Sequence, residues 1–212
     1  MQKLHNIQLV ISDWSGVFSD DRLPVYESNM RVIEKHGKKR VSFDEWLPVT
    51  RLTPIELFSD FGVTGDHDLL FEEYRQTLNA VRNEGIHPVV YQDAMMTLKG
   101  LLKRKLPIVI VSSHPEKNLI AEAEEYGIKN FITTFYGNAK DKTEEILKVA
   151  ATYNLSPGST LYMGDTIYDI QAAKKAKVHS IGVATGYHVK ERLISEKPDV
   201  VLDSLFSLLD YI

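Results

Sequence analysis

The sequence contains no cysteine, which excludes disulfide bonds, thiolate nucleophiles and cysteine-ligated zinc sites. It also has no apolar run of about 20 residues that could cross a membrane and no long polybasic stretch. The few residues before the first apolar run do not resemble a signal peptide. We therefore expect a cytoplasmic protein that binds neither a membrane nor nucleic acid.

Charges of the two signs nearly balance, with 25 basic and 29 acidic side chains and a net charge of −4. The 212 residues are 43% hydrophobic, which is typical of a globular protein with one core or one core and a small appendage. Nothing in this composition favours a particular assembly, so we expect a monomer or a homodimer.

Short β-branched runs alternate with stretches of helical periodicity along most of the chain. Alternation of this kind predicts right-handed βαβ units, and hence a doubly wound α/β domain with a Rossmann-like parallel sheet. The expected strands are residues 7–12, 106–113, 131–136, 160–164, 179–183 and 199–202. The expected helices are residues 116–126, 141–153, 168–177, 189–195 and a closing helix at 204–212.

One segment interrupts this pattern after the first strand. Between residues 23 and 88 the apolar residues recur at helical spacing, and no continuous β-branched run appears. Turn-forming residues mark both of its ends. We therefore predict an α/β core made of residues 1–22 and 89–212, with residues 23–88 inserted as a helical cap.

Acidic residues follow two of the predicted strands. Asp13 ends the first, and Asp165 ends the strand at 160–164, with Asp169 one helical turn later. An aspartate in either place could simply cap a helix. Because the carboxyl ends of parallel strands meet at one edge, the two carboxylates are expected to lie together, and their repulsion implies a cation such as Mg²⁺.

A serine pair and a lysine complete the predicted site. Ser112 and Ser113 end the strand at 106–113, where hydroxyl groups and helix-opening amides can hold phosphate oxygens. Lys142, or alternatively Lys140, opens a later helix and could neutralise a transferring phosphoryl group. Taken singly, the serines could be helix caps and either lysine a surface residue.

The order of these motifs resembles the haloacid dehalogenase superfamily. Asp13-Trp14-Ser15-Gly16-Val17, the serine after an apolar run, the lysine and Gly164-Asp165-Thr166-Ile167-Tyr168-Asp169 correspond to its four motifs. The inserted cap extends the resemblance over essentially the whole chain. In detail the sequence is most similar to the branch of phosphoglycolate phosphatases and β-phosphoglucomutases.

The resemblance implies a phosphatase that forms a covalent aspartyl phosphate. Asp13 would attack phosphorus, Ser112 would bind the phosphoryl group and Lys142 would stabilise its charge. It also implies that Mg²⁺ is held by Asp13, the Ser15 carbonyl and Asp165, with Asp169 as a further ligand or as the group that orients a bound water. The expected substrate is a small phosphorylated metabolite. The other candidate binding residues are Ser113, Ser15, Gly16, His114 and, in the cap, Arg51.

Ser15 departs from the family pattern, because family phosphatases usually carry a second aspartate there as general acid and base. Three alternatives follow. The protein is a slow phosphatase with another proton donor such as His114. It is a carbon–phosphorus hydrolase, because Asp13-Trp14-Ser15-Gly16 resembles the Asp-Trp-Ala-Gly of phosphonoacetaldehyde hydrolases, although residues 50–56 lack the expected cap lysine. Or it is a module that binds Mg²⁺ and phosphate with negligible turnover.

Overall fold

The computed structural model describes residues 3–212, which divide into two compact units. The core unit contains the chain up to Asp20 and from Val90 to Ile212, and the cap unit is Asp21–Val89. Two short strands, β2 (Ser19–Asp20) and β3 (Val89–Val90), pair with each other where the chain leaves the core and returns to it.

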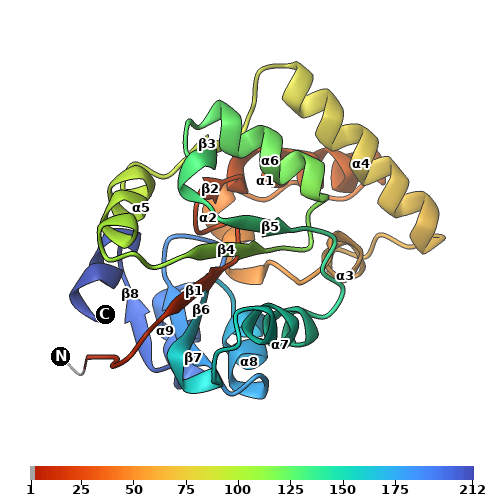
Figure 1. Ribbon diagram of the computed structural model, residues 1–212. Coiled ribbons are helices and arrows are strands. Elements are labelled where there is room, and N and C mark those ends of the chain that lie inside the picture. Colours follow the sequence, from red (N-terminus) through yellow and green to blue (C-terminus); the bar gives the residue numbers. More distant parts are fainter. Residues whose placement is uncertain (1–2) are drawn as a thin grey trace. The chain divides into compact units, whose positions relative to one another are not determined.

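The core contains a six-stranded sheet in the order β5-β4-β1-β6-β7-β8, and the strand pairs are parallel (Figure 1). Strand β1 is central, and its last residue, Ser12, pairs with Ile110 of β4 and Met163 of β6. The carboxyl ends of these three strands therefore lie side by side. The strands are β1 (Leu9–Ser12), β4 (Ile108–Val111), β5 (Thr134–Tyr136), β6 (Thr160–Gly164), β7 (His179–Val183) and β8 (Val200–Leu202).

Both faces of this sheet are buried, as expected for parallel strands covered by helices. In β1, Val10 belongs to one apolar cluster while Leu9 and Ile11 belong to the other, and all three are fully buried. Helices α5 and α6 supply side chains to the first cluster, and α7 and α8 supply them to the second. The core helices are α5 (Ala94–Lys103), α6 (Glu116–Glu125), α7 (Lys142–Thr152), α8 (Ile167–Lys175) and α9 (Lys190–Ser195).

The cap unit contains helices. Ser42 and Thr53 each form a capping box that starts a helix, and the Asp66 carboxylate accepts hydrogen bonds from two helix-opening amides. Trp46 is fully buried against the ring of Tyr26. The cap helices are α1 (Arg22–Lys35), α2 (Phe43–Trp46), α3 (Pro54–Asp60) and α4 (His67–Asn83), with a 3-10 helix at Leu47–Val49.

Four details of the core differ from the sequence expectations. Helix α5 was not predicted. The strand expected at 131–136 begins only at Thr134, because Lys129–Phe131 forms a 3-10 helix. The closing helix is a 3-10 helix at Leu205–Asp210, and a further 3-10 helix at Pro157–Ser159 precedes β6. Among the described residues, no helix is long and apolar enough to span a membrane.

Candidate active site

Asp13 lies directly after β1, at the centre of the carboxyl edge of the sheet, and is 6% exposed. Its carboxylate accepts two hydrogen bonds: Oδ1 from the main-chain N–H of Trp14 at 2.8 Å and Oδ2 from Lys142 Nζ at 2.5 Å. The Ser12 hydroxyl donates to the Asp13 carbonyl at 2.6 Å. These contacts fix both the main chain and the carboxylate of Asp13.

Asp165 and Asp169 are placed by the junction between β6 and α8. Asp165 follows the last residue of β6, and Thr166 caps α8 in a capping box whose acidic partner is Asp169. Both aspartates are buried, at 1% and 0% exposure. The local helix-start signal therefore determines where the carboxylates of Asp165 and Asp169 lie.

Four protein donors surround the Asp169 carboxylate. Oδ2 accepts from the Thr166 amide at 3.1 Å and from its hydroxyl at 2.5 Å, while Oδ1 accepts from Tyr162 OH at 3.0 Å and Lys142 Nζ at 2.6 Å. A carboxylate has about four lone-pair positions that can accept hydrogen bonds, and these four donors fill them. Burial alone would raise the pKa of Asp169, but Lys142 and these hydrogen bonds hold it below its ordinary value.

Lys142 opens α7, whose N-cap, Asp141, accepts hydrogen bonds from the amides of Thr143 and Glu144. Its ammonium group bridges Asp13 and Asp169, the two carboxylates already described. Burial opposes the charged form, yet the two aspartates raise the pKa of Lys142 well above its ordinary value. Lys140 is exposed, so the structure brings Lys142 rather than Lys140 into the cluster.

The carboxylate oxygens of Asp13, Asp165 and Asp169 lie within 4.8 Å of one another, and all three residues are buried. Lys142 supplies one positive charge against three negative charges. Burial, followed by the charges of Asp169 and Asp13, raises the pKa of Asp165 well above its ordinary value. This set of hard oxygen donors with excess negative charge could hold a divalent cation.

Two glycines allow loops to approach Asp165 closely. A Cβ on Gly16 would lie 2.1 Å from Asp165 Oδ2, and one on Gly186 would lie 2.0 Å from the same atom. Gly16 also has a φ of +71°, which favours glycine. The next residue after Gly186, Tyr187, donates its amide to Asp165 Oδ2 at 2.7 Å. Sequence reasoning missed this loop, although a glycine soon after β7 at the carboxyl edge was a usable signal.

The segment after β4 carries the predicted phosphate-binding residues. Ser112 is buried, and its hydroxyl accepts a hydrogen bond from the main-chain N–H of His114 at 3.4 Å. Ser113 is exposed and His114 is partly buried. Among the described residues, the His114 imidazole makes no hydrogen bond or ion pair.

Ser15 and Arg51 are the remaining predicted residues. Ser15 is partly buried in the turn after Asp13 and pairs with Ser19 in an isolated bridge. Arg51 belongs to the cap unit, where its guanidinium forms an ion pair with Asp60 at 2.6 Å. Within the core unit the structure therefore brings together Asp13, Lys142, Asp165 and Asp169, while Arg51 belongs to the other unit.

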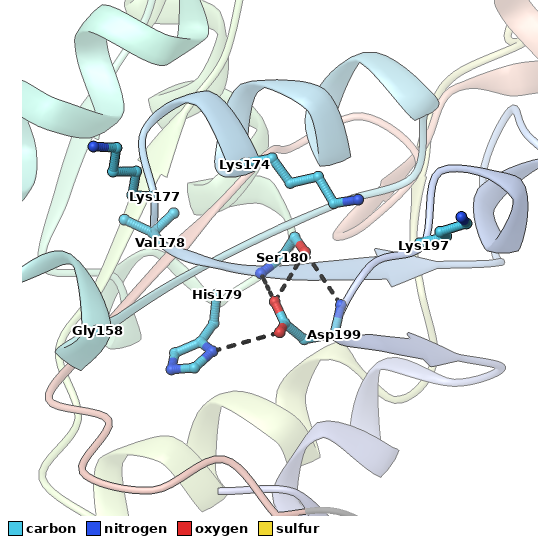
Figure 2. Close-up of a pocket in the computed structure, with 8 residues that line it drawn as sticks. All are labelled: Gly158, Lys174, Lys177, Val178, His179, Ser180, Lys197 and Asp199. Carbon is cyan, nitrogen blue, oxygen red and sulfur yellow. Dashed lines mark hydrogen bonds and ion pairs between the residues drawn. The ribbon is translucent and has the colours of Figure 1, made fainter.

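A pocket of about 300 Å³ lies at the opposite edge of the sheet, near the starts of β7 and β8 (Figure 2). Its Asp199 carboxylate accepts hydrogen bonds from the amide and hydroxyl of Ser180. Figure 2 shows the side chains of Lys174, Lys177 and Lys197 pointing in different directions, so they form no common anion cradle. The residues Asp13, Lys142, Asp165 and Asp169 do not line this pocket.

Comparison with known families identifies this architecture. The model of the haloacid dehalogenase-like hydrolase family matches residues 10–183. The chain belongs to the haloacid dehalogenase-like hydrolases. The match includes Asp13, Lys142, Asp165 and Asp169, and it confirms the family resemblance and the α/β fold class predicted from the motifs.

Individual relatives of this haloacid dehalogenase-like hydrolase include phosphatases. A phosphoglycolate phosphatase of Photobacterium profundum is 24% identical over 100% of this chain and 98% of its own length. Another from Salmonella typhimurium is 31% identical over 66% of this chain and 56% of that protein. A haloacid dehalogenase-like hydrolase structure from Streptococcus pneumoniae, 17% identical, has a TM-score of 0.78 and covers 97% of this chain and 98% of its own. The family and these relatives indicate a phosphatase.

Proposed function

We propose that this protein is a Mg²⁺-dependent phosphatase of small phosphorylated metabolites, with Asp13 as its nucleophile. One observation carries the proposal: Lys142 bridges Asp13 and Asp169 while Asp165 lies in the same buried cluster. The phosphoglycolate phosphatase relatives support a small phosphate monoester as substrate, and phosphoglycolate is the first compound to test.

The donor set fits Mg²⁺. Asp13 and Asp165 are the proposed protein ligands, together with the main-chain carbonyl of Ser15. Because four protein donors already surround Asp169, we assign it to holding Lys142 rather than to direct metal binding. When bound, Mg²⁺ would supply positive charge that balances the carboxylates and the phosphate oxygens.

Asp13 is proposed to act in two displacements. In the first, a carboxylate oxygen of Asp13 forms a bond to phosphorus while the bond from phosphorus to the ester oxygen breaks, and the alcohol leaves after taking a proton from water. In the second, water attacks phosphorus, the bond to Asp13 breaks, and inorganic phosphate and a proton are released. In this proposal Lys142 stabilises the phosphoryl oxygens in both steps, and Ser112 binds them.

Ser15 sets the expected speed of this reaction. A serine hydroxyl is not an effective general acid or base near neutral pH, and such catalysis typically contributes about 10²–10⁴ in rate. The His114 imidazole is not aligned by any contact among the described residues, so we propose that water fills this role. We therefore expect slower turnover than in phosphatases that carry a second aspartate.

Phosphate release with Mg²⁺ and a panel of phosphate monoesters, including phosphoglycolate, tests the proposal. Wild-type protein should release phosphate, and Asp13→Asn should reduce release to background because an amide is a poor nucleophile. Asp203→Asn is the matched control, because its carboxylate is 71% exposed and pairs with Lys190.

Two outcomes would contradict the assignment of phosphatase activity. Cleavage of phosphonoacetaldehyde, with borohydride trapping a lysine adduct, would show a carbon–phosphorus hydrolase instead. A rise in melting temperature with Mg²⁺ and phosphate, without turnover of any ester, would show a binding module.

A further inference from the structure

Trp14 carries the amide that orients the proposed nucleophile, and its main chain is held on both sides. Its N–H donates to Asp13 Oδ1 at 2.8 Å. Its carbonyl accepts from the amides of Phe18 at 2.9 Å and Ser19 at 3.1 Å, which closes residues 14–19 into a compact turn. A displacement of Trp14 would therefore move the donor that sets the direction of the Asp13 carboxylate.

The indole of Trp14 is fully buried in the core unit. It stacks on Tyr126, with ring centroids 6.0 Å apart and planes at 10°, and lies 5.9 Å from the ring of Phe18. Its Nε1–H donates to Glu122 Oε2 at 2.8 Å. Packing thus holds the plane of the ring, and Glu122 fixes its rotation within that plane.

Glu122 lies on α6, the helix that follows the Ser112 segment, and it also contacts the end of the Trp14 turn. The Ser19 hydroxyl lies 3.3 Å from Glu122 Oε2 and 2.9 Å from Tyr126 OH. One carboxylate oxygen of α6 therefore accepts from both the first and the last residue of the turn that follows the nucleophile. The Asp13 turn and the Ser112 helix are joined through this atom.

We propose that Glu122 is a positioning residue for phosphoryl transfer, which acts by fixing the Trp14 indole and, through it, the amide directed at Asp13. The inference rests on the proposed function of Asp13. Without its acceptor, the buried indole N–H would be left without a hydrogen-bond partner, which is costly, so the ring would shift toward another acceptor. Misplacement of a reacting group by about 1 Å can lower a rate roughly 10²-fold.

The test compares three variants on α6 and its partner. Glu122→Ala removes the acceptor, Glu122→Gln retains a carbonyl oxygen for the indole, and Trp14→Phe removes the indole N–H but keeps a ring. Glu125→Ala is the control, because Glu125 is exposed on the same helix. We expect Glu122→Ala and Trp14→Phe to lower kcat by about 10- to 100-fold with little change in KM, and Glu122→Gln to recover most of it. The double variant should lose little more than either single variant.

The indole N–H signals in an NMR spectrum report the contact itself. The sequence has two tryptophans, so Trp14→Phe identifies the Trp14 signal, which should shift in Glu122→Ala and stay in place in Glu125→Ala. Unchanged kcat in Glu122→Ala despite a shifted signal would overturn the proposal. Equal losses in Glu122→Ala and Glu122→Gln would also overturn it. If wild-type protein shows no turnover, the proposed function fails. If wild-type protein turns over substrate and Glu122→Ala does so equally fast, only the positioning role of Glu122 fails.

Discussion

Replacing Asp165 with asparagine should have opposite effects on the metal-free and the Mg²⁺-bound protein. Asp165 is 1% exposed, and its carboxylate lies within 4.8 Å of those of Asp13 and Asp169. Lys142 contacts the other two carboxylates. Without a metal ion, burial beside these acidic groups raises the pKa of Asp165 well above its ordinary value, so holding this carboxyl group in the fold near neutral pH costs free energy.

The magnitudes follow from this arrangement. In EDTA, Asp165→Asn should raise the free energy of unfolding by about 1–3 kcal/mol, the usual cost of a buried group whose partners are incomplete. In wild-type protein, Mg²⁺ at a hundred times its Kd should add about 2.7 kcal/mol. For a chain of this size that corresponds to a rise in melting temperature of roughly 5–10 °C.

Differential scanning fluorimetry with and without Mg²⁺ measures both effects. The variant should melt higher than wild type in EDTA and respond weakly to Mg²⁺, while Asp203→Asn, an exposed aspartate, should behave as wild type. A variant that is destabilised in EDTA and still gains the full Mg²⁺ increment would refute the reasoning.

Three further predictions concern the same site. Lys142→Met should lower kcat in a phosphate-release assay by about 10²–10³-fold, while Lys140→Met should keep a kcat near that of wild type. Equal losses of kcat in the two variants would reject Lys142 as the site lysine. Ser15→Asp should raise the turnover of phosphate esters toward the roughly 10²-fold gain of general acid–base catalysis, and no gain would show that Ser15 is not the limiting residue. Gly186→Ala should abolish the Mg²⁺-dependent rise in melting temperature, because the added Cβ would lie 2.0 Å from Asp165 Oδ2, and an unchanged response would show that the loop can move away.

The sequence predicts the elements that local patterns determine. Strands β1 and β6 are continuous apolar runs, and each ends one residue before an aspartate, so parallel pairing alone predicts that Asp13 and Asp165 are neighbours. Helix α5 was missed, because Gly100 weakens its helical signal. The glycine is explained only by tertiary packing, since a Cβ there would lie 2.3 Å from the Leu209 side chain.

Contacts between distant residues account for what sequence reasoning could not find. Tyr162 alternates within β6 like any buried strand residue, and only the fold shows its hydroxyl 3.0 Å from Asp169. Glu122 looks like a helix surface residue, yet it lies 2.8 Å from the Trp14 indole nitrogen across 108 residues of sequence. The choice between Lys140 and Lys142 also required coordinates, because Lys140 precedes the N-cap Asp141 and is exposed, while Lys142 opens α7 and reaches Asp13.

Rapid quenching of the reaction with borohydride tests the nucleophile directly. Borohydride reduces an acyl phosphate to an alcohol, so wild-type protein mixed with Mg²⁺ and phosphoglycolate should yield a peptide in which residue 13 has become homoserine, detected by mass spectrometry. The same peptide from protein without substrate should retain Asp13. Release of phosphate with residue 13 never converted, or conversion of a different aspartate, would contradict the assignment of Asp13 as the group that accepts the phosphoryl group.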